Sequence, residues 1–191
     1  MKALITGGAG YVGSHCNLLF SQKNIETVVL DDLSYGSEEL VVTGRFVLGD
    51  IGDEGLLDRL FQAEGFDAII HFAAIANIPE SMANPALYYE NNVIKMKTLL
   101  DAALRHGIKN FVFSSSAATY GEVETVPVFE NDPQIPINPY GTSKLIDEMM
   151  LADYQRAYGL NYVAFRYFNV AGASPDGRLG EVDITGNHIV P

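Results

Sequence analysis

The chain has 191 residues, of which 48% are hydrophobic and 10% aromatic, which is enough for one domain with a substantial core or slightly more. Its formal charge of −12 disfavours nucleic acid or an anionic membrane as a partner, because both attract clustered Lys and Arg. The single cysteine excludes an internal disulfide framework, no Cys/His cluster has metal-ligand spacing, and no apolar run reaches membrane-spanning length.

Short β-branched runs alternate with longer helical patterns along the chain. In order, we expect strand 2–6, helix 11–22, strands 25–30 and 45–48, helix 53–64, strand 67–72, helix 85–106, strand 110–114, helix 140–158 and strand 161–167. This alternation predicts an α/β protein with a doubly wound parallel sheet. The first strand begins almost at residue 1 and leaves no room for a secretory signal, so a cytoplasmic location is expected.

A glycine-rich turn, Gly7-Gly-Ala-Gly10-Tyr11-Val12-Gly13, joins the first expected strand to the first helix. Its glycines allow a tight turn, close approach of a pyrophosphate and packing of the helix against the sheet, while the helix N-terminus supplies N–H donors. The turn therefore predicts a dinucleotide-binding site. The alternative is an ordinary tight turn between a strand and a helix.

Acidic residues follow the second expected strand. Asp31 ends that strand, 18 residues after Gly13, where a carboxylate can accept hydrogen bonds from ribose hydroxyls. Residues 32–37, which include Asp32, contain no Arg or Lys, so a 2′-phosphate would face two acids without a cation. The pattern favours NAD over NADP. Alternatively, these acids only cap the strand.

Further candidate cofactor contacts follow the third and fourth expected strands. Ligands of this fold bind beyond the carboxyl ends of strands, where the strand order reverses. Asp50, followed by Ile51, is placed to accept a hydrogen bond from an adenine amino group, and Phe72, Ala73 and Ala74 allow close passage of a cofactor. The alternative is that Asp50 caps a turn and the alanines only pack.

Tyr140 and Lys144 lie four residues apart, downstream of the serine run 114–116. This spacing brings the two side chains onto one helical face. A nearby ammonium lowers the pKa of a phenol, because positive charge favours the phenolate. Tyrosine ordinarily titrates near 10, so the pair predicts a tyrosine that acts as a base near neutral pH.

Four segments together resemble the extended short-chain dehydrogenase/reductase family, most closely its nucleotide-sugar 4-epimerases. They are the glycine turn, Phe111-Val-Phe-Ser-Ser-Ser116, Tyr140-x-x-x-Lys144 and Arg166-Tyr-Phe-Asn-Val-Ala-Gly172. The resemblance covers essentially the whole chain. It implies a Rossmann fold, a tightly held NAD, and interconversion of UDP-glucose and UDP-galactose through a transient 4-keto sugar.

The resemblance also implies roles for individual residues. Tyr140 would take the proton of the sugar 4-hydroxyl, Lys144 would lower the pKa of Tyr140 and hold the nicotinamide ribose, and Ser116 would hydrogen-bond the reacting oxygen. Further residues would contact the cofactor (Asn92, Ser114, Tyr167) or the substrate (Phe168, Asn169). Ser116 could instead be a strand-end hydroxyl bonded to backbone, and the role of Asn169 stays open.

Two departures within the motifs bear on the activity. The related 4,6-dehydratases carry an Asp-Glu pair where this chain has Ala117 and Ala118, so water elimination lacks its proton carriers and epimerisation is favoured. Many epimerases place a lysine where this chain has Ala76, which weakens the expectation of irreversible NAD retention.

The final residues define the expected domain boundary. After Phe168 the sequence becomes loop-like, so we expect a NAD-binding domain over residues 1–170 and the truncated beginning of a substrate-binding region over residues 171–191. Family members continue into a domain that holds the uridine. Three hypotheses stay open: a UDP-hexose 4-epimerase, an NAD-binding fragment without turnover, and another NAD-dependent dehydrogenase, reductase or nucleotide-sugar-modifying enzyme of the same family.

Two of the expected helices carry more apolar residues than one sheet face needs. They could line a homodimer seam, as the resemblance implies, although internal core is the commoner role of such a stripe. The residues concerned are Met96, Leu99, Leu100, Ala103, Met149, Met150 and Tyr154.

Overall fold

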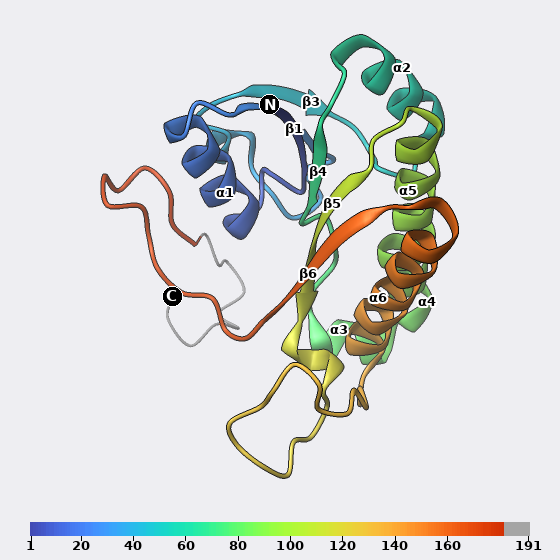
Figure 1. Ribbon diagram of the computed structural model, residues 1–191. Coiled ribbons are helices and arrows are strands. Elements are labelled where there is room, and N and C mark those ends of the chain that lie inside the picture. The colour runs from blue at the N-terminus through green and yellow to red at the C-terminus, as the bar shows by residue number, and fades with distance from the viewer. Residues whose placement is uncertain (182–191) are drawn as a thin grey trace.

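A computed structural model of the chain describes residues 1–181 and contains one parallel six-stranded sheet (Figure 1). The strands are β1 (Lys2–Thr6), β2 (Glu26–Asp31), β3 (Arg45–Leu48), β4 (Ala68–His71), β5 (Asn110–Ser116) and β6 (Asn161–Tyr167). Their order is β3-β2-β1-β4-β5-β6, and every neighbouring pair is parallel. The predicted doubly wound parallel sheet is confirmed, because the order reverses between β1 and β4.

Helices connect the strands. They are α1 (Tyr11–Gln22), α2 (Glu54–Glu64), α3 (Ile78–Ala83), α4 (Pro85–Tyr88), α5 (Lys95–Arg105) and α6 (Pro139–Tyr158), with the short 3₁₀ turns η1 (Glu38–Leu40) and η3 (Ala117–Thr119) and the π-helical segment η2 (Tyr89–Ile94). The prediction of one continuous helix over residues 85–106 is wrong, because η2 interrupts it. Helix α3 was not predicted. None of the helices in residues 1–181 is long and apolar enough to cross a membrane.

Helix α6 begins and ends at residues suited to those positions. Asn138 caps it by accepting a hydrogen bond from the Gly141 backbone N–H at 2.8 Å, and Pro139 occupies the first turn. Gly159 follows the helix in the left-handed conformation, at φ 72°. These caps place Tyr140 in the first turn of α6, at the end that lies near the carboxyl end of β5.

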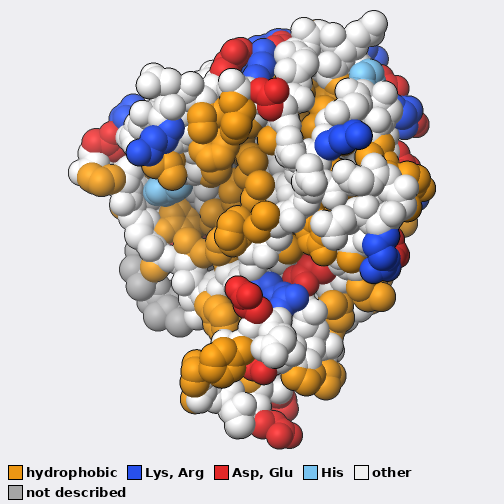
Figure 2. Space-filling view, in the orientation of Figure 1, with side chains coloured by type: hydrophobic (Ala, Val, Ile, Leu, Met, Phe, Trp, Pro, Cys, Tyr) orange, Lys and Arg blue, Asp and Glu red, His pale blue; other side chains and the backbone are white. Residues whose placement is uncertain are grey.

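The two faces of the sheet are covered unequally. In Figure 1, α1 lies on one face, and α2, α4, α5 and α6 lie on the other. The larger cluster of buried apolar residues fills the second face, and a smaller cluster lies beneath α1. Val163 and Phe165 of β6 are 51% and 48% exposed. Figure 2 shows hydrophobic side chains gathered between α1 and β6, where no described helix covers the sheet.

Most of the predicted dimer seam lies in this core. Met96, Leu99, Leu100 and Ala103 are all 0% exposed, so the prediction that they line a seam is wrong and they belong to the hydrophobic core. Their helix packs directly on the sheet, which removes them from any outer surface. Met150 and Tyr154 pack against the same core, and Met149 is 60% exposed.

This difference in burial predicts that shortening a side chain lowers the free energy of unfolding by different amounts on α5 and α6. Replacing Leu100 by Ala should lower the free energy of unfolding by about 2–5 kcal/mol, because it leaves a cavity in the core. The control is Met149→Ala on the exposed surface of α6, with an expected change within about 0.5 kcal/mol. Urea denaturation measures both, and equal effects would contradict the assignment of α5 to the core.

Candidate active site

The predicted site residues meet at one edge of the sheet. The glycine turn follows β1, Phe72-Ala73-Ala74 follow β4, Ser114 and Ser116 end β5, and α6 begins nearby with Tyr140. This edge is the carboxyl end of the parallel strands at the reversal of strand order, where ligands of doubly wound sheets bind.

The glycine turn packs tightly against β4 and α1. Gly7 has a φ of +71°, and a Cβ there would overlap the backbone of Ala73. A Cβ on Gly13 would overlap the backbone oxygen of Gly7, although its own φ is not left-handed. Gly10 caps α1 without a side-chain hydrogen bond, so the first N–H groups of the helix have no capping side chain. The tight turn and the close packing of the helix predicted for these glycines are therefore present, and the approach of a pyrophosphate stays a prediction.

The carboxylates of Asp31 and Asp32 both accept hydrogen bonds from backbone N–H groups near the glycine turn. Asp31, 9% exposed, accepts hydrogen bonds from the backbone N–H groups of Ala9 at 3.0 Å and Leu33 at 2.9 Å. Burial raises the pKa of Asp31, and those two hydrogen bonds oppose the shift. Asp32 accepts from the backbone N–H of Ser34 at 2.8 Å. The capping role considered for these acids is present in the structure, and binding of ribose stays a prediction.

Tyr11 connects the glycine turn to the chain after β6. Its hydroxyl donates to the Gly172 carbonyl at 2.6 Å, and burial raises the pKa of the phenol. A cavity of about 220 Å³ lies at this junction, with both Tyr11 and Val12 in its wall. The full lining is Tyr11, Val12, His15, Val170, Ala171, Gly172 and Ala173.

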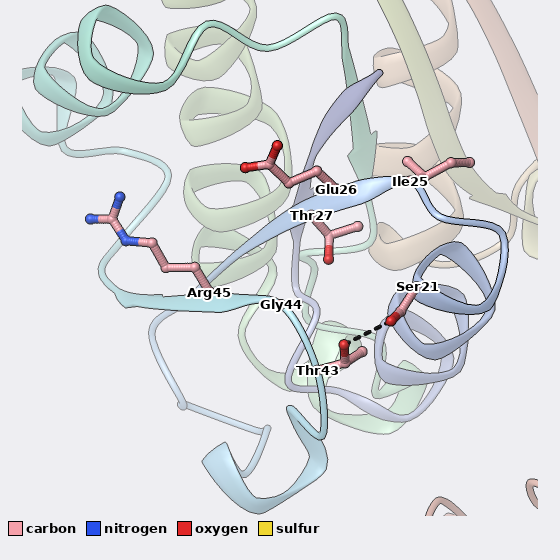
Figure 3. Close-up of a pocket in the computed structure, with 7 residues that line it drawn as sticks. All are labelled: Ser21, Ile25, Glu26, Thr27, Thr43, Gly44 and Arg45. Atoms are coloured by element: carbon pink, nitrogen blue, oxygen red, sulfur yellow. Dashed lines mark hydrogen bonds between the residues drawn. The ribbon is translucent and has the colours of Figure 1, made fainter.

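Another cavity of about 220 Å³ lies far from this edge (Figure 3). It is formed at the amino ends of β2 and β3, by Ser21, Ile25, Glu26, Thr27, Thr43, Gly44 and Arg45. Thr43 donates to the Ser21 hydroxyl at 2.9 Å across it. Because parallel strands point away from this end, the cavity does not belong to the candidate site.

Asp50 has a partner that the sequence did not reveal. The Lys95 ammonium donates to its carboxylate at 2.5 Å, and the Gly52 backbone N–H donates at 2.7 Å. Ile51 beside it is 6% exposed and part of the core. The predicted contact of Asp50 with adenine would therefore share this carboxylate with Lys95, which comes from the start of α5.

Ser116 and Tyr140 meet, and Lys144 lies one turn after Tyr140 on α6. The Ser116 hydroxyl hydrogen-bonds the Tyr140 side chain. The Lys144 ammonium donates to the Ser114 carbonyl at 2.9 Å and lies 4.7 Å from the centre of the Phe113 ring. Lys144 is only 2% exposed, and burial lowers its pKa to about 8.

The predicted lowering of the Tyr140 pKa by Lys144 is wrong for this structure. Burial raises the pKa of Tyr140, and the hydrogen bond from Ser116 is what opposes the rise. The physical reason is that the phenol is largely desolvated, while the ammonium is directed to the Ser114 carbonyl. Ser116 also accepts a hydrogen bond from the Ala118 backbone N–H at 3.1 Å. Its hydroxyl therefore interacts with the backbone as well as with Tyr140.

Asn92 joins the loop after β4 to α6. Its side-chain oxygen accepts from the Ile75 N–H at 2.9 Å, and its amide donates to the Ile75 carbonyl at 3.0 Å and to Ser143 at 3.2 Å. Ser143 precedes Lys144 on α6. Asn92 is 1% exposed and lies in η2, so the π-helical segment sets its position. The neighbouring Asn91, which sequence reasoning missed, donates to Asn92 at 3.2 Å.

Tyr167 ends β6 in register with Ser116 of β5, and Phe168 and Asn169 follow the strand. The ring of Tyr167 stacks on Phe165 at 6.0 Å between centroids. Phe168 is 64% exposed, and Asn169 is also exposed. Their predicted contacts with a substrate stay predictions.

An ion pair behind the site was also missed. Arg166 on β6 donates to the Glu148 carboxylate on α6 at 2.7 and 3.0 Å, and to the Tyr120 hydroxyl at 2.7 Å. Ser115 donates to Glu148 as well. This network ties α6 to β5 and β6. A charged residue inside the otherwise apolar pattern of the last strand was the available signal.

Fold and glycine turn together define the class of Rossmann-like α/β proteins. The family model "NAD dependent epimerase/dehydratase family" matches residues 3–184, and the chain belongs to this family. UDP-glucose 4-epimerases of Halalkalibacterium halodurans and Lacticaseibacillus casei are 49% and 50% identical over the whole chain. The chain spans 57% and 58% of their lengths.

Solved structures agree with this membership. The UDP-glucose 4-epimerase from Brucella ovis in complex with NAD is 49% identical, with a TM-score of 0.92, and covers 94% of this chain. The enzyme from Bifidobacterium longum in complex with NAD⁺ and UDP is 36% identical, with a TM-score of 0.91 over 95% of this chain. The chain covers 55% and 57% of these two structures.

Proposed function

We propose that the chain is the cofactor-binding part of an NAD-dependent 4-epimerase of UDP-hexoses, which interconverts UDP-glucose and UDP-galactose. The observation that carries the proposal is the meeting of Ser116, Tyr140 and Lys144 beside the glycine turn, at the carboxyl ends of β1, β4 and β5. The named relatives, which are UDP-glucose 4-epimerases, support the substrate class.

The site fits NAD on the features that the structure describes. The start of α1 offers N–H groups without a capping side chain, suited to a pyrophosphate. Gly10 has room for close approach, because a Cβ there would meet only the Gly7 oxygen at 3.4 Å. Asp31 and Asp32 lie where ribose is expected, with no Arg or Lys in residues 32–37, which favours NAD over NADP.

In the proposed mechanism, Tyr140 carries a proton. Bound NAD would supply a reversible hydride acceptor for sugar C4. Tyr140 would take the proton of the 4-hydroxyl and later give it back to the same oxygen. Ser116 would donate to the reacting oxygen, and Lys144 would hold the nicotinamide ribose.

The length of the chain limits what it is expected to do alone. The uridine diphosphate is remote from C4, and its binding energy normally positions the sugar for hydride transfer. The chain spans 57% of its Halalkalibacterium halodurans relative, so the domain that holds the uridine is proposed to lie in the rest of such proteins. The predicted beginning of that region covers residues 171–191, of which 182–191 lie outside the described residues.

A coupled assay on UDP-galactose tests the proposal, with UDP-glucose formation detected through NADH. We expect slow turnover by the 191-residue chain and retention of NAD through gel filtration. Turnover close to that of a full-length relative would contradict the fragment hypothesis. Net accumulation of NADH without the coupling enzyme would indicate an ordinary dehydrogenase, and failure to retain NAD would contradict the cofactor assignment.

We also propose a homodimer and a cytoplasmic location. With the core residues excluded, the large apolar residues of the two helical segments that are exposed are Tyr89, Ile94, Met149 and Tyr158, at 37%, 50%, 60% and 58% exposure. These would form the contact. Light scattering would test the dimer, and cell fractionation would test the location.

A further inference from the structure

A buried carboxylate near Lys144 has no place in the mechanism above. Asp147 lies three residues after Lys144 on α6, a spacing that puts both side chains on one helical face. It is 0% exposed, and neither carboxylate oxygen has a hydrogen-bond partner among the described residues. A buried polar group without a partner is costly, so its retention in the core requires a physical reason.

Lys144 is held by contacts that suit a positive charge but do not neutralise it. Its ammonium donates to the Ser114 carbonyl at 2.9 Å and lies 4.7 Å from the centre of the Phe113 ring. A carbonyl dipole and an aromatic face both attract a cation. At 2% exposure, the ammonium still requires a counter-charge to remain ionised in the interior.

The other titratable groups around Lys144 are either shared with another cation or neutral. Glu148 is paired with Arg166 and also accepts hydrogen bonds from Ser115 and Gln134. His71 on β4 is buried, and its pKa is lowered to about 3, chiefly by burial and also by Lys144, so it is neutral. Burial raises the pKa of both Tyr140 and Tyr88, which keeps these phenols neutral. Glu148 adds negative charge near Lys144 as well, but its carboxylate is shared with Arg166. Among the described residues, Asp147 is the nearby carboxylate that has no other partner.

We propose that Asp147 is a positioning residue whose carboxylate supplies the counter-charge that keeps Lys144 an ammonium ion. The inference deepens the proposed function, because Lys144 is one of the residues proposed to hold the cofactor. Burial lowers the pKa of Lys144 to about 8, and Asp147 is the first of the charges that oppose this fall. Burial raises the pKa of Asp147 well above its usual value, Lys144 opposes that rise, and the Glu148 charge adds to it. Removal of the Asp147 charge should therefore lower the pKa of Lys144 further.

The experiment is a pH titration of the lysine side chains in the intact chain by NMR, without dinucleotide. The Lys144 signal is assigned by its absence in Lys144→Arg. We expect its midpoint near pH 8 in the unchanged chain, and about one to three pH units lower in Asp147→Asn. The matched control is Asp153→Asn, which removes a 67% exposed carboxylate of the same helix and should leave the Lys144 midpoint unchanged.

A folded Asp147→Asn chain with an unmoved Lys144 midpoint would overturn the proposal. If that variant does not fold, the protonation state of Asp147 is measured in the unchanged chain instead, from the NMR chemical shift of its carboxyl carbon. An ionised Asp147 throughout the range in which Lys144 is charged supports the proposal, and a protonated one overturns it. Because no dinucleotide is present, a failure of the proposed function through lack of NAD binding would leave this result unaffected.

Discussion

Replacing Tyr140 by Phe is expected to lower the rate of 4-epimerisation by about 10²–10⁴-fold, the range typical of a lost general acid–base group. The phenylalanine ring can keep the edge-to-face contact with Tyr88, at 6.5 Å between centroids, so the fold should be preserved. Only the hydroxyl that hydrogen-bonds Ser116 is removed. Dinucleotide affinity should change little, because the substitution leaves the glycine turn intact.

Single-turnover conversion of UDP-galactose, with the chain in excess and NAD saturating, measures this effect even when steady-state turnover is slow. The control is Tyr158→Phe, which removes a hydroxyl from a 58% exposed tyrosine at the other end of the same helix and should leave the rate unchanged. A Tyr140→Phe chain as fast as this control would remove Tyr140 from the mechanism.

Replacing Gly13 by Ala is expected to abolish detectable dinucleotide binding and to destabilise the fold. A methyl group there would overlap the backbone oxygen of Gly7, and backbone at the centre of the turn cannot move aside cheaply. Overpacking of this kind typically costs about 1–3 kcal/mol, occasionally more. The displaced turn would also misplace the N–H groups at the start of α1, which we propose to bind the pyrophosphate.

Gly10→Ala is the matched comparison in the same turn. Gly10 has an ordinary φ of −86°, and an added Cβ would meet the Gly7 oxygen at 3.4 Å, which is normal contact. We expect this variant to keep its free energy of unfolding and to lose affinity only through contact with the ligand. Urea denaturation and calorimetric NAD titration separate the two effects. Equal stability of the two variants would show that Gly13 is not needed for packing.

Much of the fold follows from local patterns. The strand expected over residues 161–167 is found as Asn161–Tyr167, and the first helix as Tyr11–Gln22. These elements were predictable because apolar periodicity and glycine or proline boundaries act within a few residues. The interruption of the expected helix 85–106 by η2 was not predictable, because Asn92 is held there by Ile75 and by Ser143 of α6.

The site shows the same division. Spacing identified Tyr140 and Lys144 as neighbours on one helical face, and it did not reveal that Lys95 pairs with Asp50 from 45 residues away. Nor could a stripe such as Leu99 and Leu100 be assigned to core or to a seam, since both locations favour the same side chains.

The sequence by itself determined the order of strands and helices, the positions of the glycines that the turn requires, and the residues that share a face of α6. These depend on backbone conformation and spacing within single elements. Only the tertiary structure decided that burial raises the pKa of Tyr140, that Lys144 is directed to the Ser114 carbonyl, and that Asp147 lies beside it without a hydrogen bond. Desolvation and charge pairing depend on which distant elements pack together, and local pattern does not specify that packing.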